Sequence, residues 1–187
     1  MLLDLAHAVQ TLQQGHVLAY PTEAVWGLGC DPYNAQAFDQ ILQLKNRPVE
    51  KGVILVAANL AQAQPFLTGL NAAQIDKIQR TWQSSSEQQQ ATTWLVPLSP
   101  AVPPWICGQH DQLAIRISHH PLVQQLCLAF GSALVSTSAN PATLAPALSV
   151  EQIREYFGDM AMLSGQLGSC RLPSKIVDIV TGRVIRA

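Results

Sequence analysis

The sequence of 187 residues has few charged and few aromatic side chains: 12% are Asp, Glu, Lys or Arg, and 6% are Phe, Trp or Tyr. The 11 basic and 12 acidic residues give a formal net charge of -1, which argues against a protein that binds nucleic acid over its whole surface. Apolar residues still make up 48% of the chain, so the low charge does not indicate disorder. The composition and length predict a single folded domain, residues 1–187.

Long apolar runs and paired cysteines are also missing. No run approaches the ~20 apolar residues that span a bilayer, and the first residues lack the basic segment of a secretory signal. The four cysteines, Cys30, Cys107, Cys127 and Cys170, are far apart, with no C-x-x-C pair. Such spacing is typical of reduced, buried thiols, with a metal or redox role as the minor alternative. We therefore expect a cytoplasmic protein without a membrane contact or a stably bound metal.

Several enzyme signatures are absent. There is no G-x-x-x-x-G-K-[ST] loop, and Gly27-Leu28-Gly29 continues into Cys30-Asp31 and not into a dinucleotide fingerprint. His119 and His120 are adjacent, so they do not share a face as a metal-binding i, i+4 pair would. A Ser/His/Asp hydrolase is formally possible, but no G-x-S-x-G motif supports it.

Strand-like and helix-like segments alternate along the chain without a repeat, which predicts an α/β fold close to the α+β class, with a twisted, mixed or parallel sheet between helices. The continuous apolar run at residues 52–58 is expected in the middle of that sheet, covered on both faces. The expected helices are residues 3–14, 35–45, 60–67, 72–82, 122–130 and 150–157. The expected strands are residues 16–20, 52–58, 94–98, 113–117, 133–136, 176–180 and 183–186, and the last two should form a hairpin.

The stretch from Tyr20 to Lys51 combines turn residues with positive charge. A strand should end in a Pro-Thr-Glu turn and a Gly-x-Gly kink, before a helix capped by Asn34. Phe38, Ile41, Leu42 and Lys45 share one face of this helix, so Lys45 closes a face that otherwise packs inward.

Lys45, Arg47 and Lys51 place three of the eleven basic residues within seven positions. One interpretation is a solvated helix end, where cations are favoured by the helix dipole. The other is a phosphate-binding cluster, with lysine as a point charge and arginine as a fork. The buried face that carries Lys45 favours the second.

Polar side chains follow other strand-like segments and have two interpretations each. Thr22 and Glu23 form either an ordinary turn or a ligand contact at a strand end. The Ser136–Asn140 segment is either a polar strand end or a second wall of an anion site. Ser174 enters another strand, and Arg116, the one charge in its strand, is either paired structurally or anchors a carboxylate.

Five blocks in order resemble the YrdC/TsaC family, the short bacterial threonylcarbamoyl-AMP synthases. They are Tyr-Pro-Thr-Glu-Ala-Val-Trp-Gly-Leu-Gly-Cys-Asp, Leu-Lys-Asn-Arg-Pro, Leu-Ala-Ile-Arg-Ile, Ser-Thr-Ser-Ala-Asn and Pro-Ser-Lys-Ile-Val-Asp, from about Gly15 to the C-terminus. The resemblance implies a YrdC-like fold with a concave, positively charged cleft. It also implies that ATP is held by Lys45, Arg47, Ser138 and Asn140, of which Lys45 and Arg47 are catalytic, and that threonine is held by Thr22, Arg116, Ser136 and Ser174. Glu23 and Lys51 would be neighbours of this site.

The implied activity joins L-threonine, bicarbonate and ATP, accompanied by Mg²⁺, into threonylcarbamoyl-AMP and pyrophosphate. A threonylcarbamoyl transferase complex would then modify adenosine 37 of tRNA, and the resemblance also implies weak direct binding of tRNA or other RNA. An alternative is an RNA-binding module of the same fold that lacks synthesis. A third is a paralogue that uses a different amino acid or carbamoyl donor.

Two departures from the family pattern concern loops. The family's Trp-Pro-Gly-Pro-x-Thr block is replaced here by Trp82, a longer polar stretch and Thr93, so a contact from Thr93 to the nucleotide is in doubt. The usual Ser-Gly after the asparagine is replaced by Pro141-Ala142-Thr143, from which we expect a loss of backbone freedom.

Overall fold

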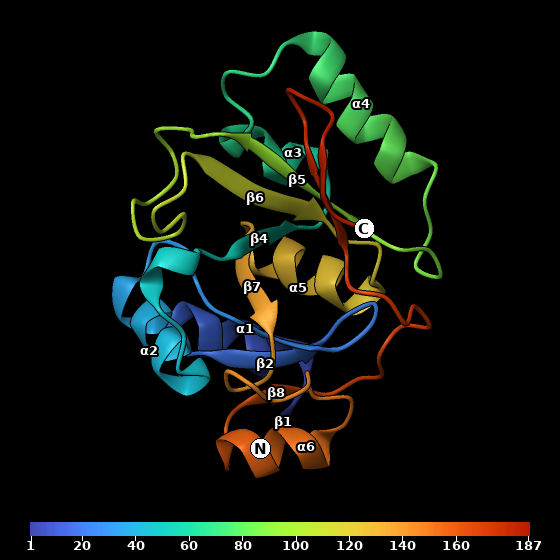
Figure 1. Cartoon of the computed structure of the whole chain (residues 1–187). Helices are drawn as coiled ribbons and strands as arrows, with labels where there is room; N and C mark the ends of the chain where they lie inside the picture. Colours follow the sequence, from blue (N-terminus) through green and yellow to red (C-terminus); the bar gives the residue numbers. More distant parts are fainter.

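The computed structural model describes all residues from Met1 to Ala187. Its centre is a ten-stranded sheet with the order β1-β8-β2-β3-β7-β4-β6-β5-β9-β10 (Figure 1). Parallel pairs such as β4 with β6 and antiparallel pairs such as β5 with β6 both occur, so the predicted α/β fold with a mixed sheet is confirmed. The strands are β1 (Leu2–Leu3), β2 (Leu18–Pro21), β3 (Trp26–Gly29), β4 (Ile54–Ala57), β5 (Thr92–Pro97), β6 (Gln112–Ile117), β7 (Leu134–Ser138), β8 (Met162–Leu163), β9 (Lys175–Asp178) and β10 (Val184–Arg186).

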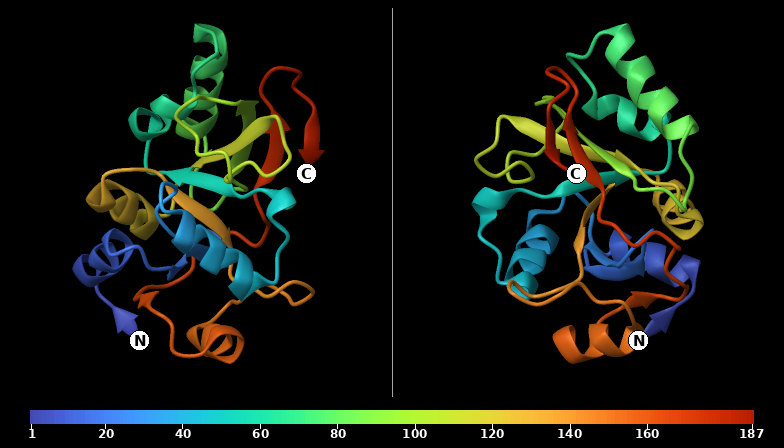
Figure 2. Two further views of the ribbon diagram at one scale, coloured as in Figure 1. Left: turned by 90° about the vertical axis from the view of Figure 1, so that its left-hand side faces the viewer. Right: turned by 45° about the vertical axis from the view of Figure 1, so that its right-hand side comes forward.

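Helices cover both faces of the sheet, and the sheet separates two buried apolar clusters. Helices α1 and α5 contribute to the smaller cluster and contact each other, whereas α2, α3, α4 and α6 contribute to the larger one. Both views in Figure 2 place α4 and α6 at opposite ends of the molecule. None of the helices is long and apolar enough to cross a membrane. The helices are α1 (Leu5–Gln13), α2 (Ala35–Lys45), α3 (Leu60–Ala63), α4 (Ala72–Gln83), α5 (Pro121–Phe130) and α6 (Val150–Phe157), with short 3-10 helices η1 (Val49–Lys51) and η2 (Gln64–Phe66).

Strand β4 lies between β7 and β6, as its continuous apolar run predicted. Leu55 and Ala57 belong to the larger cluster, and Val56 and Ala58 to the smaller one. Because successive side chains of a strand point to opposite faces, a strand covered on both sides needs apolar residues throughout.

Helix α2 follows its prediction closely. The side chain of Asn34 accepts a hydrogen bond from the backbone N–H of Ala37 at 3.0 Å, which caps the first turn. Phe38 and Ile41 are fully buried, and Lys45 on the same face is only 4% exposed. Asn46 then adopts a left-handed conformation with φ 47° and ends the helix.

The expected Gly-x-Gly kink is wrong. Gly27 and Gly29 lie in strand β3, which pairs antiparallel with both β2 and β7. A Cβ on Gly29 would come within 2.7 Å of the Tyr20 ring and would also meet the Val135 carbonyl. Gly29 therefore allows a close approach between neighbouring strands and does not supply an unusual backbone angle.

Other boundaries also differ from the sequence pattern. The helix expected at residues 60–67 is divided into α3 and η2, and the two-residue strands β1 and β8 had no prediction. The C-terminal hairpin is confirmed, because β9 and β10 pair antiparallel.

Candidate active site

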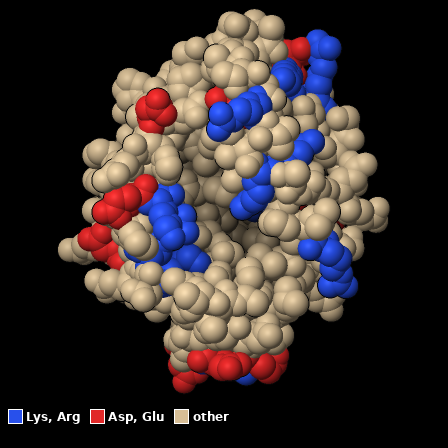
Figure 3. All heavy atoms as spheres, in the orientation of Figure 1, with Lys and Arg blue, Asp and Glu red and all other residues tan.

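A cleft of about 550 Å³ opens at the middle of the molecule. Figure 3 shows it as a hollow with Lys and Arg side chains on two opposite sides. Four arginines and a single carboxylate are among the lining residues, namely Arg47, Arg116, Arg171, Arg186 and Glu23. Such a lining suits a ligand that carries several negative charges.

The cleft draws its walls from distant parts of the chain. The lining residues come from the turn between β2 and β3, the start of β4, Arg116 on β6 and the β7 residues Ser136, Thr137 and Ser138. Residues 171–174 and Arg186 on β10 complete the lining. The sheet thus brings together residues more than 150 positions apart in the sequence, such as Thr22 and Arg186.

Lys45 is bound to the segment that follows β7 and does not itself line the cleft. Its ammonium donates to the carbonyl oxygens of Ser138 and Asn140, the latter at 2.8 Å, and to the Asn140 side-chain oxygen at 3.2 Å. The Ser138 hydroxyl donates to the same Asn140 oxygen at 2.6 Å. Burial, with the nearby charge of Arg47 adding to it, lowers the pKa of Lys45 to about 8. The structure therefore brings Lys45, Ser138 and Asn140 together in one network.

Arg47 lies just beyond the end of α2 and is half-buried in the cleft wall. Its Nε donates to the carbonyl of Gly52 at 3.3 Å, and its Nη2 donates to the carbonyls of Lys51 and Gly52 at 3.3 and 3.0 Å. The Nη1 group makes no hydrogen bond within the protein. Arg47 is thus held by backbone carbonyls while part of its guanidinium stays available to a ligand. Lys51, on the exposed helix η1, does not line the cleft.

Arg116 and Glu23 both line the cleft and form an ion pair, with 3.1 Å between Nη1 of Arg116 and Oε2 of Glu23. The Glu23 carboxylate also accepts hydrogen bonds from the Ser118 hydroxyl at 2.7 Å and the His119 backbone N–H at 3.1 Å. Burial would raise the pKa of Glu23, but the charge of Arg116 and these hydrogen bonds outweigh it and lower the pKa to about 2. The structural interpretation of Arg116 therefore holds, and Arg116 also lines the cleft.

Thr22 forms a turn and also lines the cleft. Its hydroxyl donates to the carbonyl of Val25 at 2.7 Å, which closes the turn locally, and its side chain nevertheless lines the cleft. Ser136 lines the cleft from β7, where it pairs with Ile54 of β4.

Ser174 belongs to a chain of polar groups that the sequence did not indicate. The hydroxyls of Ser174 and Thr93 are 2.7 Å apart, and Arg186 donates to the Ser174 carbonyl through Nε at 3.0 Å and Nη2 at 2.6 Å. Thr93 is fully buried and is not among the residues lining the cleft. Thr93 therefore contacts Ser174 without lining the cleft itself.

Arg171 and Arg186 line the cleft although the sequence gave no reason to select them. Arg186 lies at the end of the predicted C-terminal hairpin, so the only signal was a basic residue in a predicted strand. Arg171 lies in an irregular segment between β8 and β9. Both are placed by tertiary folding, which local patterns do not describe.

The polar stretch after Trp82 is anchored, because the Gln90 side chain donates to the Pro173 carbonyl at 2.9 Å beside the cleft. After Asn140, Thr143 adopts a left-handed conformation with φ 78° although it carries a side chain. This conformation is rare for a β-branched residue, so the loop keeps its turn at a cost in strain.

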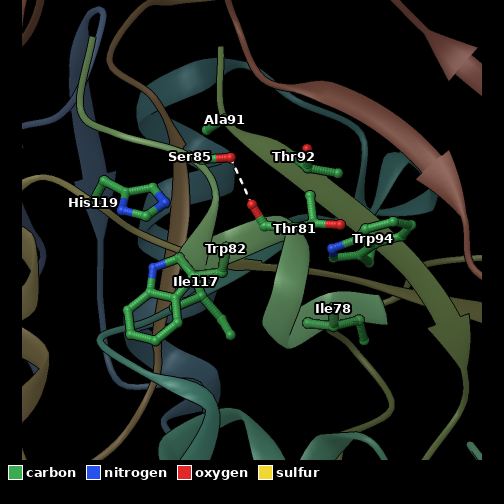
Figure 4. A pocket seen from close by; sticks show the side chains of 9 residues that line it. All are labelled: Ile78, Thr81, Trp82, Ser85, Ala91, Thr92, Trp94, Ile117 and His119. Carbon is green, nitrogen blue, oxygen red and sulfur yellow. Dashed lines mark hydrogen bonds between the residues drawn. The ribbon is translucent and has the colours of Figure 1, made fainter. Parts of the chain in front are cut away.

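A second, much smaller pocket of about 10 Å³ lies between α4 and β5 (Figure 4). The Trp82 and His119 rings stack beside it with centroids 5.7 Å apart, and the Trp82 indole donates to the Ser118 carbonyl at 3.4 Å. Its volume suits about one water molecule, so it is too small for a substrate.

Groups that could hold a metal directly do not converge. No group of three or more His, Cys, Asp or Glu residues is arranged to bind an ion, and the four cysteines are buried and unpaired. The only cleft carboxylate, Glu23, already accepts three hydrogen bonds from the protein.

A mixed sheet around an arginine-lined cleft is the arrangement that suits an anionic ligand. The chain matches the Sua5/YciO/YrdC family, described as "Telomere recombination", over residues 10–187. A relative from Acinetobacter baylyi, named Threonylcarbamoyl-AMP synthase, is 52% identical over 98% of this chain and 96% of its own. The chain belongs to the Sua5/YciO/YrdC family.

Two solved structures share the fold at lower identity. E. coli YciO has a TM-score of 0.80 and 21% identity, over 100% of this chain and 92% of its own. P. abyssi Sua5 complexed with L-threonine has a TM-score of 0.83 and 21% identity, over 95% of this chain and 54% of its own. This chain therefore spans about half of that longer protein.

Proposed function

We propose that the protein is a threonylcarbamoyl-AMP synthase, which joins L-threonine, bicarbonate and ATP into threonylcarbamoyl-AMP, pyrophosphate and water. The observation that carries this proposal is the 52% identity, over 98% of the chain, to a protein of that name. The arginine-lined cleft supports it independently, because both ATP and the product are anions.

The phosphate end of the cleft would lie at Arg47 and Ser138. Arg47 has a free part of its guanidinium, and Ser138 lines the same cleft. Lys45 and Asn140 would act there mainly by holding the segment after β7 in place, and the Lys45 charge would add to the field at the phosphates. Arg171 and Arg186 also line the cleft and would contribute further positive charge.

The amino-acid end would lie at Thr22, Arg116, Ser136 and Ser174, which all line the cleft. P. abyssi Sua5, which shares the fold, is known in complex with L-threonine. Arg116 would bind the threonine carboxylate, and the hydroxyl-bearing residues would bind the polar groups of the amino acid.

The chemistry needs positioning more than a protein nucleophile. The amine of threonine and bicarbonate first form a carbamate, with loss of water, and this carbamate is short-lived in water unless the cleft shields it. A carbamate oxygen then attacks the α-phosphorus of ATP, and pyrophosphate leaves. Arg47 would stabilise the charge that develops on the phosphate oxygens, which makes Arg47 and Lys45 the proposed catalytic pair.

Mg²⁺ would enter with ATP and supply further neutralisation of the phosphates. The saturated carboxylate of Glu23 does not suit a direct metal contact, so the phosphate oxygens would be the main ligands of the ion.

The product is a mixed anhydride, so a transferase must consume it. By the family resemblance this step would be the transfer of the threonylcarbamoyl group to adenosine 37 of tRNA, in the cytoplasm. Any direct RNA contact would be weak and confined to a local basic patch, because the net charge of the chain is -1.

Replacement of either proposed catalytic residue tests this function. Lys45→Ala and Arg47→Ala should each abolish pyrophosphate release that depends on threonine and bicarbonate, because each removes positive charge from the phosphate end. Arg154→Ala, on the exposed face of α6, is the matched control and should keep full activity. Circular dichroism checks that the variants are folded. Full activity in both Lys45→Ala and Arg47→Ala would exclude the assignment of this site.

A further inference from the structure

Glu23 is the one buried carboxylate at the cleft, and the proposed chemistry leaves it without a task. It lies in the turn between β2 and β3 and is 2% exposed. Burying a carboxylate in its charged form is costly unless it is paired and hydrogen-bonded. A carboxylate in this place therefore calls for an explanation beyond the turn itself.

The contacts of Glu23 exclude a direct role in the chemistry. Oε2 is engaged by Arg116, and Oε1 accepts hydrogen bonds from the Ser118 hydroxyl and the His119 backbone. Its pKa is far below that of an effective general base at neutral pH. Glu23 can thus act only through the groups that it holds.

The pair of Glu23 and Arg116 joins two parts of the sheet that are not adjacent. In the strand order, β2 and β3 are separated from β6 by β7 and β4. The β2–β3 turn nevertheless meets the end of β6 through this ion pair and through the two hydrogen bonds from Ser118 and His119. Glu23 therefore fixes the position of Arg116 relative to Thr22, its neighbour in the turn.

Glu23 also determines which part of the Arg116 guanidinium remains free. Nη1 is engaged by Glu23, Nε is buried without a partner, and Nη2 makes no hydrogen bond within the protein. The Arg116 side chain is 12% exposed, so it has little room to move. A second carboxylate that enters the cleft would meet a guanidinium whose orientation is already set.

We propose that Glu23 is a positioning residue for the amino-acid substrate: it orients Arg116 through Nη1 so that Nη2 receives the substrate carboxylate, an inference that rests on the proposed function.

A double-mutant comparison tests whether Glu23 acts through Arg116. The variants are Glu23→Gln, Arg116→Gln and the combination of both, and the readout is kcat/KM for threonine, which stays measurable when binding is weak. Glu23→Gln should lower this value about tenfold or more, the loss expected for one charge-assisted hydrogen bond. In the Arg116→Gln background the same change should have less than about a twofold effect, because the group that Glu23 orients is gone.

Two further measurements separate positioning from a general loss of structure. The KM for ATP should stay within about twofold of the wild type in Glu23→Gln, because the phosphate end does not contact Glu23. Glu87→Gln makes the same chemical change at a carboxylate that lies 3.8 Å from His120 and does not line the cleft, and it should leave kcat/KM for threonine unchanged. If Glu23→Gln alone does not fold, Glu23→Asp takes its place in the comparison, because it keeps the negative charge but shortens the reach to Arg116.

The outcomes are distinguishable. A threonine kcat/KM that is unchanged in Glu23→Gln, or that falls equally in both backgrounds, overturns the positioning role while the proposed function stands. An equal loss of threonine and ATP parameters also overturns it, because that pattern indicates general disruption. A wild-type protein without threonine-dependent pyrophosphate release overturns the proposed function and the role of Glu23 together.

Discussion

Lys45 ends helix α2 with its charge inside the protein, where three oxygens of Ser138 and Asn140 surround the ammonium. The helical spacing of Phe38, Ile41 and Lys45 predicted this burial, because all three share one face. The sequence did not show that the partners would be protein oxygens. Those partners come from β7 and the segment after it, more than 90 residues away, and only the folded sheet brings them close.

The lowered pKa of Lys45 predicts a pH dependence of activity. Below about pH 8 the ammonium is charged and holds the segment after β7, and above that pH the charge is lost. Pyrophosphate release should therefore decline with a midpoint near pH 8. The threonine amine has the opposite effect, since deprotonation makes it a better nucleophile. A rate that still rises at about pH 9.5 would contradict this role of Lys45.

The same shift has a defined sign for stability. The folded protein loses the Lys45 proton at a lower pH than the unfolded chain, whose pKa is near 10.5. The unfolded state thus binds more protons between these two values, and the contribution of this group to the free energy of unfolding rises with pH across that window. Activity and the stability contribution of Lys45 should therefore move in opposite directions above pH 8.

At the scale of elements, the segments with strong local patterns were predicted well. Helix α2, the buried strand β4 and the C-terminal hairpin have periodicity or turn residues that specify them. Strands β1 and β8 have two residues each and are defined only by their pairing, Leu2 with Met162 and Leu3 with Leu163. A strand that exists because of a distant partner leaves no local signal.

Strand β3 offers a direct test of why its glycines are present. Gly29→Ala should lower the free energy of unfolding by about 1–3 kcal/mol, because the added carbon would meet the Tyr20 ring at 2.7 Å and the Val135 carbonyl. Urea unfolding followed by fluorescence measures the change. Gly27→Ala is the milder comparison, since its added carbon comes no nearer than 3.2 Å, to the Thr22 methyl group. Equal stability of Gly29→Ala and the wild type would show that the strands are not in such close contact.

At the scale of the whole molecule, the cleft is a product of the sheet order. Residues from the β2–β3 turn, β6, β7 and the C-terminal hairpin meet only because the chain crosses the sheet several times. The sequence and the family resemblance supplied six of the site residues that line the cleft: Thr22, Arg47, Arg116, Ser136, Ser138 and Ser174. Arg171 and Arg186 were not predicted as site residues, because an irregular segment and a terminal strand bring them to the cleft only in the folded protein.

The same view explains how one cleft could hold two anions. Arg47 lines the cleft with free donor capacity, whereas Arg116 is already paired with Glu23. ATP and threonine would therefore meet different electrostatic environments. The carbamate would form where these environments adjoin, within reach of the α-phosphate.

Synthesis of threonylcarbamoyl-AMP is the central claim, and mass spectrometry of the product tests it most directly. The purified protein is incubated with ATP, Mg²⁺, L-threonine and ¹³C-labelled bicarbonate. The proposed function predicts an adenylate whose mass includes threonine and the heavy carbon, formed with pyrophosphate and absent when threonine is omitted. If the protein binds ATP but forms no labelled adenylate, the synthase assignment is contradicted.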